Sequence, residues 1–348
     1  MTEHLMIGVE QHVGRITLNR PEALNALSFS MIKKVQAQLD LWATDDTIHA
    51  VVVDAVPGRA FCAGGDVRAL YELGRHAPDD AISFFWHEYR LNDTLHHYKK
   101  PYVVLMNGIT MGGGVGLALH GDYALATQAF LFAMPETAIG FIPDVGASYL
   151  LSRCPSHVGM YLGLTGARIK AAEAYHLGLV YDVIDQKECS SVLSDLMTTD
   201  LSVHPHEKVK AILARYARRL EETEECLPYS KINSCFNQSS MLGIMQALEQ
   251  DASPWALDTY QTLRKKSPLS LCVTHALLRR ATTKTIRACL SLEFGVAFHC
   301  LQHHDFYEGV RALLIDKDNT PRWEPATIED VSDEMVARFF EQSPVLFA

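Results

Sequence analysis

The sequence predicts an α/β domain in its first half and a mainly helical region in its second. Through residues 1–185, short segments rich in β-branched residues alternate with segments of helical spacing, which is the pattern of an α/β core. After residue 185 the strand signals fade and helical periodicity continues. Because 348 residues with 48% hydrophobic side chains can bury a substantial core, we expect region 186–348 to pack on region 1–185.

The elements of the first half follow from local composition. Short segments rich in valine, isoleucine and leucine predict strands, at 13–20, 49–56, 102–108 and 122–127. Two helices are expected between them, over 28–44 and 79–98. In the first helix, Met31, Val35 and Leu39 recur at helical spacing, and Ser28 or Ser30 can cap its N-terminus.

The second half contains segments in which apolar residues recur every three or four positions. This spacing predicts helices, over 206–223, 239–250, 254–266, 270–282 and 285–303. The segments near 227–233 and 317–325 are predicted to be loops within this region rather than linkers between domains.

Composition excludes several classes of protein. The formal net charge of -10 argues against a nucleic-acid surface, since such affinity comes mainly from lysine and arginine. Eight cysteines without a C-x-x-C pair argue against a disulfide framework or a zinc site. No metal site is predicted from His299 and His303 either, although they are spaced i and i+4, because no glutamate follows the first histidine.

No apolar run reaches the roughly 20 residues of a membrane helix. The N-terminal residues resemble neither a signal peptide nor a mitochondrial presequence. We therefore expect a cytoplasmic protein, or a mitochondrial matrix enzyme whose presequence has been removed.

Two glycine-rich segments, "AFCAGGDVRAL" and "NGITMGGGVGLALHG", are candidates for binding an anion. Each places glycines between an apolar stretch and a helix start, where backbone N–H groups have no partner within the helix. Neither has the G-x-G-x-x-G or P-loop spacing. For either segment alone, a tight turn or close packing is the simpler explanation. Together, one N–H from each would form the oxyanion hole that acyl-transfer and enolate chemistry requires.

The segment "MPETAIGFIPDVGASYL" places Glu136 and Asp144 in apolar surroundings. Glu136 could be a carboxylate in the first turn of a helix, and Asp144 could be a helix N-cap. Alternatively, Gly140 and Pro143 interrupt the helix and let the two carboxylates converge through a bend. A carboxylate in an apolar site acquires a raised pKa, as a general base or acid requires.

These segments, with "NRPEALNAL" and "DFYEGVRALLIDKD", resemble the crotonase (enoyl-CoA hydratase/isomerase) superfamily along nearly the whole chain. Within it, the sequence is most similar to the 3-hydroxyisobutyryl-CoA hydrolase subfamily. The resemblance implies a spiral of ββα units, an acyl-CoA substrate, no separate cofactor, and hydrolysis of a 3-hydroxyacyl-CoA thioester in valine catabolism. Relatives often form trimers, so a homo-oligomer is compatible with the sequence.

The resemblance also implies roles for individual residues. It assigns the oxyanion-hole amides to Ala63 and Gly113, and the catalytic carboxylates to Glu136 and Asp144. Glu136 would attack the thioester or activate water, and Asp144 would hold the substrate's 3-hydroxyl group or position the water. The implied substrate-binding residues are Glu88, Gly64, Gly65, Asp66 and Gly112.

One position departs from the pattern of hydratases. Where they carry their first catalytic glutamate, this chain has Gly116. Hydration normally needs two acid/base groups, so the departure favours hydrolysis. The alternatives are a hydratase or isomerase acting on another acyl-CoA, and a non-catalytic acyl-CoA-binding protein.

Overall fold

The computed structural model describes residues 3–220, 227–341 and 343–347. The chain forms two compact units, each assembled from three separate segments. The first contains 1–66, 90–132 and 169–226, and the second contains 67–89, 133–168 and 227–348, in so far as these residues are described. Neither unit begins or ends near residue 185, where the sequence placed a division, because each unit contains residues from both halves of the chain.

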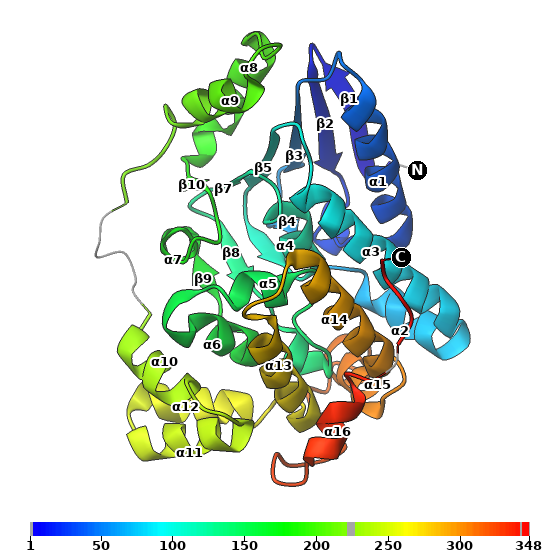
Figure 1. Ribbon diagram of the computed structural model, residues 1–348, viewed down its shortest axis with the longest axis vertical. Helices are drawn as coiled ribbons and strands as arrows, with labels where there is room; N and C mark the ends of the chain where they lie inside the picture. The colour runs from blue at the N-terminus through cyan, green and yellow to red at the C-terminus, as the bar shows by residue number, and fades with distance from the viewer. Residues whose placement is uncertain (1–2, 221–226, 342, 348) are drawn as a thin grey trace. The chain divides into compact units, whose positions relative to one another are not determined.

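The first unit is built on two sheets (Figure 1). In the described residues the larger sheet has the strand order β1-β2-β3-β5-β7-β10 and the smaller one β4-β6-β8-β9. Only β1 and β2 pair antiparallel in the larger sheet; its other neighbours are parallel. The bounds are β1 Leu5–Glu10, β2 Val13–Leu18, β3 Ala50–Ala55, β4 Ala60–Cys62, β5 Tyr102–Met106, β6 Ile109–Met111, β7 Tyr123–Ala126, β8 Leu131–Ala133, β9 Ile169–Lys170 and β10 Asp182–Val183.

The chain alternates between these sheets. A strand of the larger sheet is followed by a short strand of the smaller one, as in β3 then β4, β5 then β6, and β7 then β8. After β6 the chain forms helix α4, which completes a ββα unit. This repeat is the spiral that the family resemblance implied.

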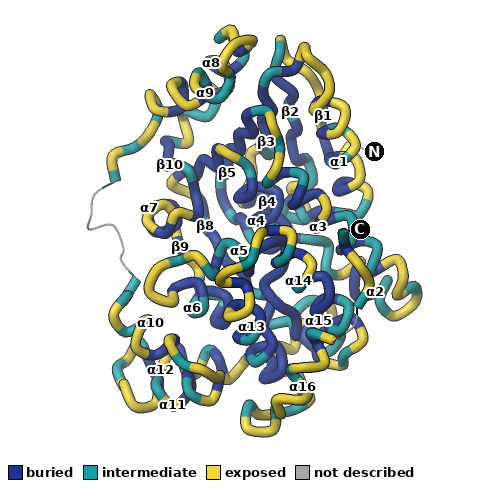
Figure 2. Tube along the Cα trace, viewed as in Figure 1, coloured by how far each residue is buried: buried dark blue, intermediate teal, exposed yellow. Residues whose placement is uncertain are grey.

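Helices cover the centre of the larger sheet because its central strands β3 and β5 are apolar on both faces. Figure 2 shows β3 and β5 as largely buried. The unit's helices are η1 Pro21–Ala23, α1 Phe29–Thr44, α4 Gly113–Ala118, α7 Ala171–His176, η4 Gln186–Glu188, α8 Cys189–Thr198 and α9 Pro205–Leu213. Apolar side chains of α8 and α9 pack on the sheet, in a cluster that includes Val52, Val103, Leu196 and Ile212. Helix α1 begins at the cap Ser28, whose hydroxyl accepts the N–H of Met31 at 3.3 Å.

The helix predicted over 206–223 is wrong beyond Leu213. There α9 ends, and the following residues turn back to pair with β10: Ala217 forms a bridge with Ile184, and the N–H of Arg218 donates to the carbonyl of Val183 at 2.8 Å. Pairing with a sheet edge satisfies backbone groups that a longer helix would have satisfied internally. Residues 221–223 of this prediction lie outside the described part.

The second unit is helical. Helix α3 begins in it and continues into the first unit from Arg90 onward. The elements are α2 Val67–His76, α3 Pro78–His96, η2 Glu136–Ile139, α5 Ala147–Leu151, η3 Pro155–His157, α6 Val158–Thr165, α10 Tyr229–Phe236, α11 Met241–Asp251, α12 Pro254–Leu263, α13 Pro268–Ala281, α14 Ile286–Cys300, α15 His304–Val310, the π-helical segment η5 Arg311–Ile315 and α16 Asp333–Arg338. Helices α13, α14 and α15 pack on α5, α6 and η2, the segment that carries Glu136. The predicted helical second half is thus confirmed. The loop predicted near 227–233 is wrong, because helix α10 begins at Tyr229, directly after Pro228.

Within the described residues, no helix is both long and apolar enough to cross a membrane.

Candidate active site

Glu136 lies at the start of η2, directly after Pro135. The short helix ends at Gly140, whose φ of 68° is in the left-handed region and whose N–H donates to the carbonyl of Glu136. A side chain at Gly140 would place its Cβ 2.2 Å from the carbonyl oxygen of Asp305, so only glycine fits. Glu136 is therefore held in a short turn, and it is 8% exposed.

Asp144 lies in the bend between η2 and α5, and it is 5% exposed. The N-cap of α5 is Gly146, so Asp144 is not the cap residue that its sequence context allowed. Its carboxylate instead accepts the hydroxyl of Tyr89 at 2.7 Å. The chain bends between Glu136 and Asp144, as the interpretation based on Gly140 and Pro143 predicted.

A third carboxylate, Glu88, lies on α3 beside Tyr89 and is 3% exposed. Oε1 of Glu88 and Oε2 of Glu136 are buried and have no hydrogen-bond partner among the described residues. Native proteins seldom leave buried polar atoms in this state, since each costs a desolvation penalty. Each of these two oxygens can therefore accept a hydrogen bond from a ligand or a water molecule.

Burial and mutual repulsion raise the pKa values of these groups. Burial, and then the charge of Asp144, raise the pKa of both Glu88 and Glu136 well above the usual range of a glutamate. Burial raises the pKa of Asp144 to about 7, against the lowering effect of the Tyr89 hydroxyl. Lys266 opposes the shift at Glu136, and burial lowers the pKa of this lysine. Asp144 can therefore exchange a proton near neutral pH, as general acid/base chemistry requires.

The C-terminal motif "DFYEGVRALLIDKD" supports η2. Asp305 is 2% exposed and accepts the hydroxyl of Ser267 at 2.5 Å and the N–H of Glu324 at 2.8 Å. A Cβ on Gly309 would lie 2.6 Å from the Cα of Ile139, so glycine lets α15 approach η2 closely. The motif thus fixes the short helix on which Glu136 lies.

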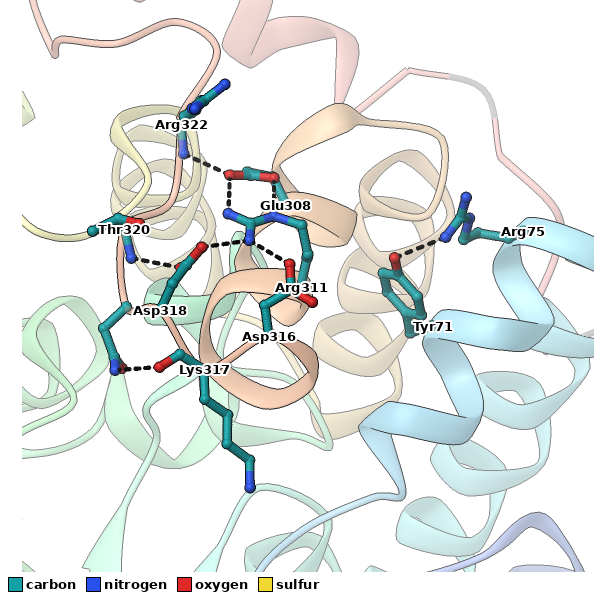
Figure 3. A network of polar contacts seen from close by, with 10 residues as sticks. Tyr71, Arg75, Glu308, Arg311, Asp316, Lys317, Asp318, Thr320 and Arg322 are labelled. Atoms are coloured by element: carbon teal, nitrogen blue, oxygen red, sulfur yellow. Dashed lines mark hydrogen bonds and ion pairs between the residues drawn. The ribbon is translucent and has the colours of Figure 1, made fainter.

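Arg311 lies within the same motif (Figure 3). Its guanidinium donates to both oxygens of Glu308 at 2.8 Å, to Asp316 at 2.7 Å and to Asp318 at 2.6 Å. Glu308 also accepts the N–H of Arg322 at 2.8 Å. The arginine therefore joins α15 to the loop that follows η5, and its role is structural. Figure 3 also shows Arg75 donating to the hydroxyl of Tyr71, one turn earlier on α2.

The two glycine turns meet within the first unit. An ideal Cβ on Gly64 would lie 3.5 Å from the carbonyl oxygen of Met111 and 3.7 Å from the nitrogen of Gly113. Gly64 has a φ of 119° and Gly112 a φ of 48°, both in the region that favours glycine. A Cβ on Gly114 would lie 2.3 Å from the carbonyl oxygen of Cys62. Glycine is required here for backbone conformation and for close packing, as the simpler explanation held.

The amide predicted for Ala63 is not free. Its N–H donates to the carbonyl of Leu24 at 3.0 Å, so the prediction that it serves as an oxyanion donor is wrong. The Gly64–Gly65 peptide offers an alternative, because the carbonyl of Gly64 accepts the N–H of Leu27 at 2.8 Å. The two groups of a trans peptide point in opposite directions, so the N–H of Gly65 points away from Leu27. In the part of the chain that is described, the N–H groups of Gly65 and Gly113 have no acceptor.

Asp66, predicted to bind substrate, forms an ion pair with Arg20 at 2.8 Å, and its N–H donates to the carbonyl of Leu27. These contacts tie the glycine turn to the segment before α1. The residues that the sequence did not point to are Tyr89 and Glu293. Both contact the Asp144 segment from distant parts of the chain, and no spacing rule links positions so far apart.

Known proteins resemble this chain over almost its full length. The family model described as Enoyl-CoA hydratase/isomerase matches residues 13–340. The mitochondrial 3-hydroxyisobutyryl-CoA hydrolase of Xenopus tropicalis is 41% identical over 94% of this chain and 86% of its own length. The human protein of the same name is 38% identical over 97% of this chain and 89% of its own.

Solved structures give a second comparison. A carnitinyl-CoA dehydratase from Mycobacterium thermoresistibile superposes with a TM-score of 0.91 at 35% identity, covering 99% of both chains. An enoyl-CoA hydratase from Rhodobacter sphaeroides superposes with a TM-score of 0.89 at 36% identity, covering 97% of both. The ββα repeat, the glycine turns and the extent of these matches lead to one conclusion: the chain belongs to the enoyl-CoA hydratase/isomerase family.

Proposed function

We propose that the chain hydrolyses an acyl-CoA thioester, with 3-hydroxyisobutyryl-CoA as the substrate. The observation that carries this proposal is the buried pair Glu136 and Asp144, in which Glu136 retains an unpartnered oxygen and Asp144 is held by Tyr89. The hydrolases of Xenopus tropicalis and human, similar over most of the chain, support the choice of substrate. The reaction would yield 3-hydroxyisobutyrate and CoA, a step of valine catabolism.

Glu136 carries the central step. Its carboxylate either attacks the thioester carbonyl carbon to form an anhydride that water then cleaves, or it removes a proton from the attacking water. In both routes the C–S bond breaks and the CoA thiol leaves. Asp144 binds the 3-hydroxyl group of the substrate or orients the water, and Glu88 shares one of these tasks.

The N–H groups of Gly113 and Gly65 stabilise the negative charge on the carbonyl oxygen. Removing one such donor costs about 2.7 to 4 kcal/mol in the barrier of other enzymes. The revised donor, Gly65, is supported by the orientation of the Gly64–Gly65 peptide. The amides belong to the first unit and the carboxylates to the second.

The test is release of free CoA, followed with a thiol reagent. The substrates are 3-hydroxyisobutyryl-, 3-hydroxypropionyl-, isobutyryl- and crotonyl-CoA, and the proteins are wild type and Glu136→Gln. Rapid release from the 3-hydroxy substrates that is lost in the variant supports the proposal. Release that persists in Glu136→Gln would contradict the role of this carboxylate.

Hydration is the second candidate, because the two solved structures with the high TM-scores are titled as a dehydratase and a hydratase. Gly116, buried in α4, argues against hydration because glycine has no acid/base group. Loss of the enoyl absorbance of crotonyl-CoA without CoA release would establish hydration. Binding of CoA esters with neither change would establish a non-catalytic acyl-CoA-binding protein.

We propose that the protein forms a homo-oligomer, to be tested by light scattering of the purified protein. The named hydrolases are mitochondrial proteins, and we propose the same matrix location or the cytoplasm of a bacterium for this chain.

A further inference from the structure

The segment that carries Asp144 adopts a backbone conformation that its own residues do not favour. Val145 has a φ of 54° and Gly146 a φ of 81°, so two consecutive residues lie in the left-handed region. A β-branched residue is a clear outlier there. Such strain persists only where the surroundings fix the conformation.

A buried carboxylate from a distant helix fixes this turn. Glu293, on α14, is 0% exposed. One of its oxygens accepts the N–H of Gly146 at 2.6 Å, and the other accepts the N–H of Ser148 at 2.9 Å and the hydroxyl of Ser148. All three groups donate, and a carboxylate is the side chain that accepts on both oxygens. A glutamine would turn an amide donor toward one of these N–H groups.

The same helix also contacts the other support of Asp144. Phe294, which follows Glu293, packs edge-on against the ring of Tyr89 with the ring centroids 6.2 Å apart. Tyr89 in turn donates its hydroxyl to the carboxylate of Asp144. Helix α14 therefore holds the backbone after Asp144 directly and supports the residue that holds its side chain.

The position of Glu293 has an electrostatic cost. Burial, and to a smaller extent the charge of Asp144, raise the pKa of Glu293 to about 8, against the lowering effect of its hydrogen bonds. A cap for α5 alone does not need a second carboxylate close to Asp144, because serine or asparagine caps helices well. We expect the benefit of orienting Asp144 to exceed the electrostatic cost of placing Glu293 near it.

We propose that Glu293 is a positioning residue, which directs Asp144 toward the substrate by clamping the turn from Gly146 to Ser148. This inference rests on the proposed hydrolase function. The competing explanation is that Glu293 only caps α5 and contributes to stability.

The experiment is a double-mutant cycle on the full chain with Glu293→Gln, Asp144→Asn and the double variant. CoA release from 3-hydroxyisobutyryl-CoA is followed over hours, so that slow variants are measurable. In Glu293→Gln, kcat falls about 10- to 100-fold while KM changes little, because the reacting groups are misplaced but the CoA portion still binds. The double variant is no slower than Asp144→Asn, within about twofold, because both changes remove the same function.

Two further variants keep the test decisive. Ser148→Ala removes one donor to Glu293 and lowers kcat in the same direction by a smaller factor. Ser291→Ala changes an exposed hydroxyl on the same helix and leaves kcat unchanged. Wild-type kcat in folded Glu293→Gln, or a loss that multiplies fully with that of Asp144→Asn, would overturn the proposal. If Glu293→Gln does not fold, wild-type kcat in Ser148→Ala overturns it.

Failure of the proposed function has a different signature, since wild type would then release no CoA. In that case a crystal structure of Glu293→Gln decides the question. Asp144 displaced from Tyr89 supports the positioning role, and Asp144 in its original contact refutes it.

Discussion

Replacing Asp144 by asparagine should stabilise the protein at alkaline pH while it strongly lowers the proposed activity. Asp144 is buried, and its pKa is raised from 3.8 to about 7, chiefly by burial. Asparagine has nearly the same shape and keeps an oxygen that can accept the Tyr89 hydroxyl. The substitution therefore removes the buried charge and little else.

The sign of the effect follows from proton linkage. Between pH 3.8 and about 7 the folded state holds a proton at Asp144 that the unfolded state has lost, so wild-type stability falls as the pH rises through this range. Above pH 7 the loss is complete. A shift of roughly 3 pKa units at 1.36 kcal/mol per unit corresponds to about 4 kcal/mol. The Asp144→Asn variant has no titrating group at this position, so its stability does not fall in this way.

The assay is urea denaturation of wild type and Asp144→Asn at pH 5 and pH 8.5. At pH 8.5 the variant should be more stable by a few kcal/mol, up to about 4, and at pH 5 the gain should shrink to about 1 to 2 kcal/mol. Asp258→Asn, an exposed carboxylate on α12, is the matched control and should show no pH-dependent difference. A variant that is equally stable or less stable than wild type at pH 8.5 would refute the argument from burial.

Two other predictions concern the segment that carries Glu136. Gly309→Ala should lower both stability and kcat, because its Cβ would lie 2.6 Å from the Cα of Ile139. Gly8→Ala is the control and should be neutral, because nothing lies within 4 Å of its Cβ. Thermal melts and CoA release measure both variants. Hydrolysis should require ionised Glu136, whose pKa is raised by burial and by Asp144, so kcat/KM should fall with decreasing pH at a higher pH than for an ordinary carboxylate. In Asp144→Asn the residual activity should extend to lower pH, and an unchanged pH profile would contradict the coupling.

Much of the fold was predictable because local patterns decided it. The segments at 49–56 and 102–108 are apolar on both faces and form β3 and β5, the buried centre of the larger sheet. The strands of the smaller sheet are only two or three residues long, too short for a period to be read. Helix 206–223 was overextended because its apolar spacing continues past Leu213, where pairing with β10 ends the helix.

The two carboxylates of the candidate site were predictable from the sequence, but the residues that hold the Asp144 segment were not. Glu136 and Asp144 lie close together in sequence, with glycine and proline to bend the chain between them. The contacts of Asp144 with Tyr89 span 55 positions, and those of Glu293 with Ser148 span 145. The sequence did not reveal that the N–H of Ala63 is already bonded to Leu24, because the direction of a peptide N–H depends on backbone conformation, and Gly64 has a positive φ that residue type does not reveal.

The fold alone does not decide between hydrolysis and hydration, since function depends on the site. A dehydratase and a hydratase superpose on this chain with TM-scores of 0.91 and 0.89. What separates the reactions is the number and position of acid/base groups. Gly116 supplies none in α4, whereas the second unit buries Glu88, Glu136, Asp144 and Glu293. Adding water across a double bond needs a base and an acid for two carbons, but hydrolysis needs one activated nucleophile and a stabilised oxyanion. In the proposed site, Glu136 would supply the nucleophile or base, and the N–H groups of Gly65 and Gly113 would stabilise the oxyanion, so hydrolysis would need no acid/base residue at position 116.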